Sequence, residues 1–252
     1  MNKISTFLTI LLLYFVSATP SLAQTELIVD GDFEGGFGAW TTMSLGMDPD
    51  GMWDISTPGA LTPISTNPTA PNPQGGSFYA VTDQTGAGTH SMYQTFTIPA
   101  GATSVDLSFD MFVNDWSGTG GIIDPIGLDH TGPANQHARV DILNAGATPF
   151  STNPADVAMQ LYIGTDGTMP AYPYQTYNFD LGSLTPGNSY IIRFASTDNQ
   201  FFFNLGVDNV SILAESPPIP TMGQWGIIIL GLLLIIVGVV KVASRVYNPA
   251  KI

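Results

Sequence analysis

Cysteine is missing from this sequence, so no disulfide can stabilise any part of the folded chain. Small exported domains often depend on disulfides, whereas a domain without them needs a full hydrophobic core or a bound metal ion. Residues 24–215, which lie between two apolar end segments, form a stretch long enough for one domain with a single core.

Basic residues are nearly as scarce, because the chain has 6 Lys and Arg against 20 Asp and Glu and a net charge of −14. Residues 24–215 hold all 20 acidic residues but only two basic ones, Arg139 and Arg193, which gives this stretch a net charge of −18. Such a surface excludes nucleic acid as a partner, since binding phosphates requires clustered Lys and Arg. Dense carboxylates instead favour divalent cations, calcium above all, although they also serve simply to keep an exported protein soluble.

Long apolar runs are confined to the two ends of the chain, and the first is typical of a secretory signal peptide. Lys3 lies beside the amino terminus, residues 7–16 are apolar, and residues 21–23 are the small-x-small cleavage site Ser-Leu-Ala. We expect export through the Sec pathway and cleavage before Gln24, so that residues 1–23 are the signal peptide. A retained N-terminal anchor is the alternative.

The second apolar run predicts a transmembrane helix near the C-terminus. Residues 225–243 carry a single charge, that of Lys241, and a helix of this length reaches roughly 28 Å, close to the hydrocarbon thickness of a bilayer. Basic residues flank only its C-terminal side, at Lys241, Arg245 and Lys251, which places the C-terminus in the cytoplasm and the rest of the chain outside.

The residues that lead into this helix, IPTMGQWG, resemble the IPTLxxWG motif of IPTL-CTERM sorting signals, which are related to the PEP-CTERM signals processed by bacterial exosortases. The matching residues are Ile219, Pro220, Thr221, Trp225 and Gly226. Met222 stands where the family usually has Leu, and the tail is longer and less basic than the usual Arg-rich end. The resemblance implies an exosortase-type partner enzyme that releases the protein or transfers it to the cell surface. The alternative is a plain membrane anchor with Trp225 at the interface.

Between the two ends, apolar residues alternate with polar ones, most clearly in the run VDLSFDM at residues 105–111. This period of two predicts half-buried antiparallel strands. Similar patterns predict further strands at residues 27–29, 37–43, 78–81, 92–98, 139–143, 157–163, 177–181, 190–194 and 207–213. We therefore expect an all-β fold, a two-sheet antiparallel jelly-roll sandwich over residues 24–215, followed by a linker and the sorting tail at 216–252. Residues 48–76 and 114–136 are expected to form long loops.

Both ends of the expected sandwich resemble carbohydrate-binding jelly-roll modules. Residues 27–34, LIVDGDFE, with Trp40 soon after, are similar to their opening strand, and residues 206–212, GVDNVSI, to their closing strand. The resemblance implies a structural calcium ion held by Glu34 and Asp208. The alternative is that both side chains are exposed or cap backbone amides. A second acidic segment, DPDGMWD at residues 48–54, is a weaker candidate because it lacks the distal Glu of an EF-hand.

Aromatic residues in the expected loops suggest a sugar-binding surface, because sugar rings stack on exposed aromatic side chains. The candidates are Trp53, Trp116, Tyr172 and Tyr174, with Phe201 as a further one. The alternative is that these rings cover loop bases or form a satellite core. Arg139 and Arg193 alternate with apolar neighbours, so we expect them to point away from the core and each to pair with an Asp.

Catalytic motifs are absent from the sequence. His90, His130 and His137 are expected in or beside loops and have no zinc-ligand spacing, and there is no GxSxG segment. We therefore expect no enzyme. The favoured function is a non-catalytic surface or matrix protein, sorted by its tail, that binds glycan and calcium. The alternatives are a specific lectin-like module and a secreted polysaccharide hydrolase, since many Asp residues offer paired carboxylates.

Overall fold

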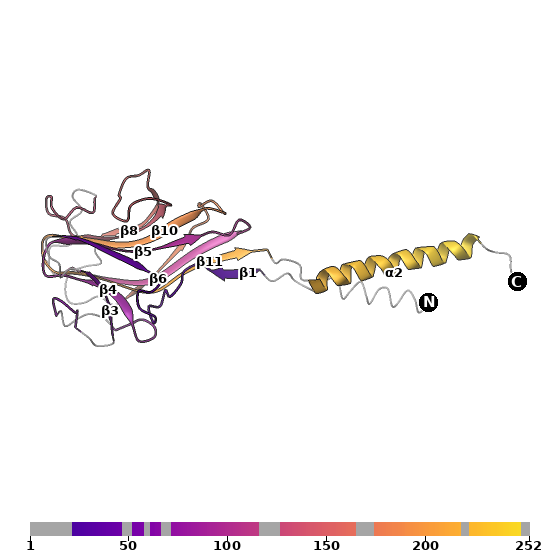
Figure 1. Ribbon diagram of the computed structural model, residues 1–252, viewed down its shortest axis with the longest axis horizontal. Coiled ribbons are helices and arrows are strands. Elements are labelled where there is room, and N and C mark those ends of the chain that lie inside the picture. Colours follow the sequence, from indigo (N-terminus) through magenta and orange to yellow (C-terminus); the bar gives the residue numbers. More distant parts are fainter. Residues whose placement is uncertain are drawn as a thin grey trace. The chain divides into compact units, whose positions relative to one another are not determined.

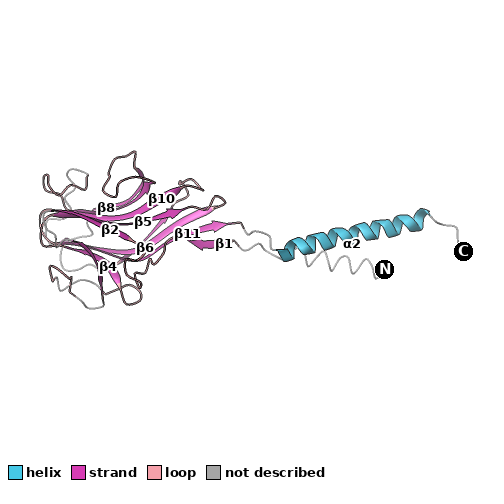
Figure 2. Ribbon diagram, in the orientation of Figure 1, coloured by secondary structure: helices cyan, strands magenta, loops and turns pink. Residues whose placement is uncertain are grey.

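The computed structural model describes residues 22–46, 52–57, 61–66, 72–115, 127–164, 174–217 and 222–247 (Figure 1). The expected signal helix lies outside these residues. The chain divides into a compact unit of Gln24–Ser216 and a second unit that holds the C-terminal helix. Figure 2 shows that the first unit is built of strands.

The strands of Gln24–Ser216 form two sheets. The first sheet has the order β3-β4-β11-β6-β9, with β1 also paired to β11. Its strands are β1 (Ala23–Glu26), β3 (Met52–Ser56), β4 (Tyr79–Asp83), β6 (Ser104–Asp115), β9 (Gln175–Asp180) and β11 (Phe203–Ser216). The second sheet has the order β2-β5-β10-β7-β8. Its strands are β2 (Thr41–Gly46), β5 (Gly88–Thr97), β7 (His137–Asn144), β8 (Val157–Gly164) and β10 (Ser189–Asp198).

The two sheets pack face to face, which confirms the predicted all-β antiparallel sandwich. Nearly every connection from β4 to β11 passes from one sheet to the other, as in a jelly roll. The core between the sheets contains Val105, Leu107 and Phe109 of β6 together with Ile192 and Phe194 of β10. Apolar residues at alternate positions of both sheets therefore meet in one core, as the period of two requires.

Two strand predictions were wrong near the N-terminus of the domain. Residues 27–29 were expected to be a strand, but β1 ends at Glu26. The Glu26 carboxylate accepts hydrogen bonds from the backbone N–H groups of Leu27 and Ile28 at 3.0 and 2.9 Å. Leu27 keeps one backbone hydrogen bond to β11, from its N–H to the carbonyl oxygen of Ile212 at 2.9 Å. The other error is β3, which lies inside the loop expected at residues 48–76.

Strand β6 shows where alternation stops being informative. Asp106 is exposed and its neighbours Val105 and Leu107 are buried, as predicted, but every residue from Phe109 to Asp115 is buried. A satellite cluster of Tyr79, Val81 and Phe112 covers the outer face there. Gly206 lies opposite Phe112 in the sheet, and a Cβ atom at this position would lie 1.8 Å from the Phe112 ring. The missing side chain makes room for that ring.

The C-terminal helix α2 (Met222–Tyr247) is long and apolar enough over Gly226–Ser244 to cross a bilayer. A helix that is apolar on every side over this length is typical of a membrane span. Trp225, Gly226, Lys241 and Arg245 lie within α2, whereas Ile219, Pro220 and Thr221 of the sorting motif lie outside the described residues.

Candidate ligand-binding site

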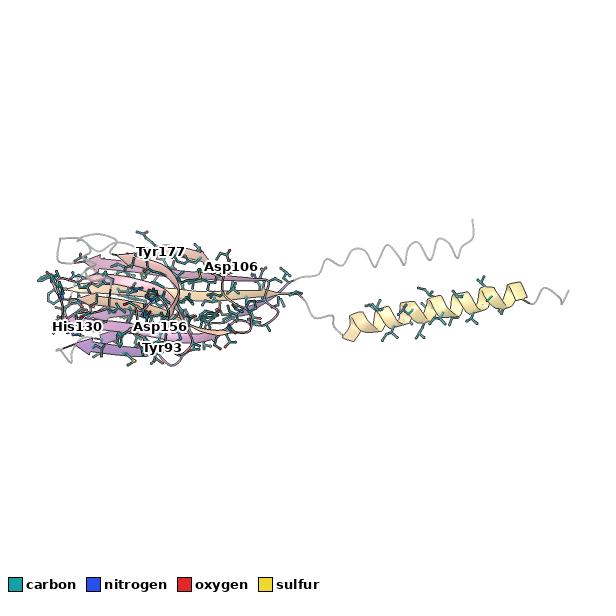
Figure 3. The ribbon with its side chains drawn as sticks, turned by 90° about the horizontal axis from the view of Figure 1, so that it is seen from above. Tyr93, Asp106, His130, Asp156 and Tyr177 are labelled. Carbon is teal, nitrogen blue, oxygen red and sulfur yellow. The ribbon has the colours of Figure 1, made fainter. Side chains whose placement is uncertain are left out.

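One end of the sandwich brings together segments that are far apart in the sequence. Gly88 of β5 pairs with both Gly46 of β2 and Asp198 of β10, and Phe203 of β11 pairs with Asp115 of β6. The β4–β5 turn (residues 84–87) and the β10–β11 turn (residues 199–202) therefore lie at the same end, which we name the distal end. Figure 3 shows His130 at this end and Asp106 towards the other.

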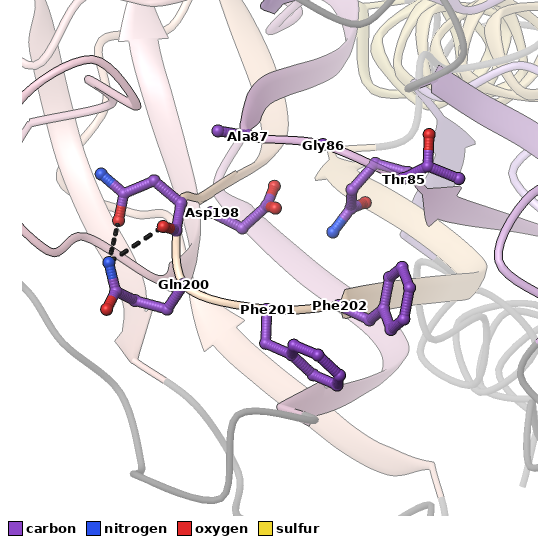
Figure 4. A pocket seen from close by; sticks show the side chains of 9 residues that line it. Thr85, Gly86, Ala87, Asp198, Gln200, Phe201 and Phe202 are labelled. Atoms are coloured by element: carbon purple, nitrogen blue, oxygen red, sulfur yellow. Dashed lines mark hydrogen bonds between the residues drawn. The ribbon is translucent and has the colours of Figure 1, made fainter.

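A pocket of about 210 Å³ lies at the distal end, between residues 84–87 of one turn and residues 198–202 of the other. Figure 4 shows Asp198, Phe201 and Phe202 around the same space. Phe201 is 54% exposed, and its ring lies 4.8 Å from that of Phe202, centroid to centroid. The pocket thus carries an aromatic surface that is open to solvent.

Two buried polar side chains, Asp198 and Gln84, line the same pocket; they are only 3% and 2% exposed. The side-chain amide of Gln84 donates a hydrogen bond to the carbonyl oxygen of Phe203 at 2.8 Å. Among the residues that the structure describes, Asp198 Oδ1 and Gln84 Oε1 have no hydrogen-bond partner. Burial is the main reason why the pKa of Asp198 is raised to about 8, and the nearby Gln84 side chain lowers it by a smaller amount. Buried acceptors without partners are uncommon in folded proteins, and these two belong to residues that line the pocket.

The β10–β11 turn is held in place from below by Gln136. Its side-chain oxygen accepts hydrogen bonds from the backbone N–H groups of Gln200 and Phe201 at 3.2 and 3.1 Å. Its side-chain nitrogen donates to Asp115 Oδ1 at 2.6 Å. Because Gln136 is fully buried and bonded at both ends, the Phe201 ring is presented on a fixed backbone.

The two basic residues of the domain both bind Asp141, away from the pocket. Arg139 donates two hydrogen bonds of 2.8 Å to the carboxylate of Asp141, and Arg193 forms an ion pair with the same carboxylate. Arg193 also donates to the carbonyl oxygens of Pro149 and Ser151 at 3.0 and 2.6 Å, in the β7–β8 connection. The predicted Arg–Asp pairing is confirmed, and both Arg side chains are buried, with the β7–β8 connection bonded to Arg193. Neither is available to the pocket.

The structure corrects two of the predicted stacking residues. Trp53 was expected in a loop but belongs to β3, is 3% exposed and packs in the main core. Tyr174 packs edge to face against Tyr79 and Phe112, with ring centroids 6.1 and 5.1 Å apart, and so belongs to the satellite cluster. Trp116 and Tyr172 lie outside the described residues. Of the aromatic candidates that the structure describes, Phe201 is the one at a pocket.

The residues predicted to bind calcium both accept hydrogen bonds from the backbone of residues 74–78. Glu34 Oε1 accepts from Ser77 and Phe78 at 2.6 and 2.9 Å. Asp208 Oδ2 accepts from Gln74 and Gly75 at 2.8 and 3.0 Å. This is the amide-capping arrangement that stood as the alternative to calcium. No group of three or more His, Asp or Glu side chains suited to a metal ion occurs in the described residues, so calcium stays a prediction.

The histidines lie near the distal end, on β5, on β7 and in the segment before β7. His90 and His137 are buried on β5 and β7, and the ring of His130 lies 3.2 Å from the Thr89 hydroxyl, Nδ1 to Oγ1. Burial is the main reason why the pKa of His90 falls to about 4, so its ring is neutral near neutral pH. Sequence reasoning missed Gln84, Gln136 and Asp198. Gln84 begins the β4–β5 turn, Asp198 directly precedes the β10–β11 turn, and Gln136 directly precedes β7, so each is only a polar residue beside a strand end.

Comparisons with known proteins identify no family. No protein-family profile and no curated protein matches the chain. Solved structures share the sandwich at low similarity. The TmCBM61 structure in complex with β-1,4-galactotriose has 10% identity and a TM-score of 0.45 and covers 75% of this chain and 97% of its own. The K1 cleaved adhesin domain of Lys-gingipain from Porphyromonas gingivalis has 14% identity and a TM-score of 0.42, with coverages of 79% and 99%.

A third structure, the enzymatically active domain of tailspike protein 4 from bacteriophage CBA120, has 14% identity and a TM-score of 0.44. It covers 74% of this chain but only 21% of its own. All of these likenesses are too distant to transfer a ligand or an activity. The function has to be argued from the pocket itself.

Proposed function

We propose that the protein is an exported, membrane-anchored β-sandwich that binds glycan in the pocket at the distal end and does no chemistry on it. The observation that carries this proposal is the combination of the exposed Phe201 ring with the acceptors Asp198 Oδ1 and Gln84 Oε1, which have no partner among the described residues. A sugar has both an apolar C–H face that stacks on an aromatic ring and hydroxyl groups that satisfy buried acceptors.

The composition of the pocket supports binding rather than hydrolysis. Hydrolysis of a glycosidic bond by the usual mechanisms requires a pair of carboxyl groups on either side of the scissile bond. Asp198 is the one titratable residue among the described side chains that line the pocket. A single carboxyl group is suited to hydrogen bonding but does not provide both an acid and a nucleophile or base.

The tail determines where this binding takes place. The apolar span Gly226–Ser244 supports a membrane anchor, and the IPTMGQWG segment supports processing by an exosortase-type enzyme before the protein reaches the cell surface or extracellular matrix. Replacing Pro220 or Trp225 should trap the full-length protein in the inner membrane, as membrane fractionation and immunoblotting would show. Normal maturation of both variants would leave the tail as a plain anchor.

A structural calcium ion at Glu34 and Asp208 belongs to the same proposal. It is supported by the resemblance of residues 27–34 and 206–212 to carbohydrate-binding modules and by the net charge of −18 that the domain derives from its composition. An ion there would serve stability rather than glycan binding, because both side chains bond residues 74–78 and do not line the distal pocket.

A glycan array tests the binding function. The full chain, purified in a detergent without a sugar headgroup, is applied with and without calcium to immobilised trisaccharides of glucose, galactose, mannose and xylose. Wild type should bind at least one trisaccharide, and Phe201→Ala should lower affinity about tenfold or more, because the stacked ring is lost. Val29→Ala is the matched control, since Val29 is an exposed apolar residue that does not line the pocket. Equal binding of Phe201→Ala and wild type would contradict the proposal.

A further inference from the structure

The chemistry of Asp198 restricts which sugars the pocket can hold. Asp198 is 3% exposed, and its Oδ1 atom has no hydrogen-bond partner in the described part of the chain. Gln84 contributes a second acceptor without a partner, Oε1, to the same pocket. The pocket therefore presents oxygen atoms at its base and an apolar ring, Phe201, at its rim.

Neither Arg of the domain balances a negative charge on Asp198. Both Arg residues of the domain bind Asp141, and the domain has no Lys. At the distal end, the titratable residues on the elements around Asp198 are Asp83 at the end of β4, His90 near the start of β5, Asp115 at the end of β6, His137 at the start of β7, and Asp129 and His130 in the segment before β7. His90 is neutral near neutral pH, mainly because burial lowers its pKa to about 4.

A buried carboxyl group without a cation is more stable with its proton than without it, because burial penalises the charged form. The pKa of Asp198, raised to about 8 by burial, agrees with this argument. A protonated carboxyl group is a hydrogen-bond donor as well as an acceptor. The same position would otherwise offer only acceptors.

We propose that Asp198 presents a protonated carboxyl group to its ligand, so that the pocket selects neutral saccharides through their hydroxyl groups and excludes acidic ones. This inference rests on the proposed glycan-binding function. A sugar hydroxyl accepts the Asp198 proton and donates its own to Gln84 Oε1, so both groups are satisfied. An anionic sugar finds no cation in the pocket and meets a domain of net charge −18.

The proposal predicts that affinity depends on pH although the ligand has no titratable group. Once Asp198 ionises, the donor is lost, and a bound sugar would cover a charge that has no cation beside it. Affinity for a neutral trisaccharide should be constant from about pH 6 to about pH 7.5. It should then fall, approaching about tenfold per pH unit above the pKa of Asp198.

The test measures binding of the full chain to neutral trisaccharides and to trigalacturonate by titration calorimetry from about pH 6 to about pH 10. Asp198→Asn keeps a donor at every pH and should remove the fall in affinity, whatever its absolute affinity. Asp106→Asn is the matched control, because Asp106 is an exposed Asp of β6 that lies away from the distal end (Figure 3), and it should show the wild-type profile.

The outcomes separate this inference from the function on which it rests. Binding of neutral trisaccharides that does not change up to about pH 10, or an Asp198→Asn profile that falls like wild type, would overturn only the inference that Asp198 is protonated. Tighter binding of trigalacturonate, or binding at about pH 6 that a chelator abolishes, would also overturn it, since Asp198 would then be ionised beside a cation. If no trisaccharide binds at any pH, the glycan-binding function itself is overturned.

Discussion

Asp208 and Asp198 are both buried Asp residues, on the consecutive strands β11 and β10 of opposite sheets. Burial is the main reason why the pKa of each is raised, yet their surroundings differ. Asp208 accepts hydrogen bonds from the backbone N–H groups of Gln74, Gly75 and Asn209. Asp198 Oδ1 accepts none from the described residues and lines an open pocket. A satisfied buried carboxylate stabilises the fold, whereas an unsatisfied one costs stability and is retained where a ligand uses it.

The largest effect on the free energy of unfolding should appear when the Asp208 carboxyl group is removed. Asp208→Ala leaves three backbone N–H groups without an acceptor, so it should lower the free energy of unfolding by about 3 kcal/mol or more. Chemical denaturation of the full chain in detergent measures this. Asp208→Asn keeps one carbonyl oxygen and should cost less. A loss below about 1 kcal/mol for Asp208→Ala would contradict the structural role.

Removing calcium gives a second test of the structural role of Asp208. If an ion joins Glu34 and Asp208, saturating calcium stabilises the folded chain by about 2.7 kcal/mol at a hundredfold excess over its dissociation constant. A chelator should then lower the melting temperature of wild type by a few degrees and have little further effect on Asp208→Ala. If the chelator affects both proteins equally, the ion lies elsewhere; if it affects neither, amide capping is the whole role of these carboxylates.

Asp198 should make stability fall as pH rises. Its pKa is raised in the folded state to about 8, so its contribution is fully present below the unfolded value of 3.8 and is lost as pH rises through about 8. His90 acts in the opposite sense, because its lowered pKa removes stability as pH falls from 6.5 to about 4. Between pH 6.5 and about 8 the effect of Asp198 is therefore isolated from that of His90.

In that window wild type should lose up to about 2 kcal/mol of unfolding free energy, and Asp198→Asn should remove most of this loss. Denaturation curves at a series of pH values would measure both proteins. The same slope in Asp198→Asn and wild type would show that Asp198 is ionised throughout, contrary to the raised pKa.

The smallest effect on stability is expected at Phe201. Its ring is 54% exposed, and the backbone beneath it is held by Gln136, so Phe201→Ala should change the free energy of unfolding by less than about 0.5 kcal/mol. Gln136→Ala, which frees the turn and leaves Asp115 without this donor, should cost clearly more. A large loss of stability in Phe201→Ala would mean that its ring is structural and that a binding defect in this variant is indirect.

The sequence by itself predicted the all-β sandwich, most of its strands and the apolar C-terminal helix. Alternation in residues 105–111 and the uninterrupted apolar run after Trp225 are local patterns that require no knowledge of distant contacts. Local patterns failed at Trp53 and Tyr174, because whether an aromatic ring is exposed depends on which strands and loops cover it.

That each Arg pairs with an Asp could be expected, since two isolated cations lie among 20 acidic residues. That both share Asp141, and that both pairs are buried, could not be predicted, because the β7–β8 connection that bonds Arg193 carries no apolar pattern to predict its position. The expected calcium ligands show the same limit, since their donors come from a turn elsewhere in the chain.

Tertiary structure alone decided which carboxyl groups are satisfied. The amide of Gln74 that bonds Asp208 lies 134 positions earlier in the chain, and the Gln84 side chain at the base of the pocket meets Asp198 only because β5 pairs with β10. The sequence shows how many carboxylates the protein has and how few cations can balance them. Hydrogen bonds form across strands, so only the folded chain determines which of these carboxylates remain open to a ligand.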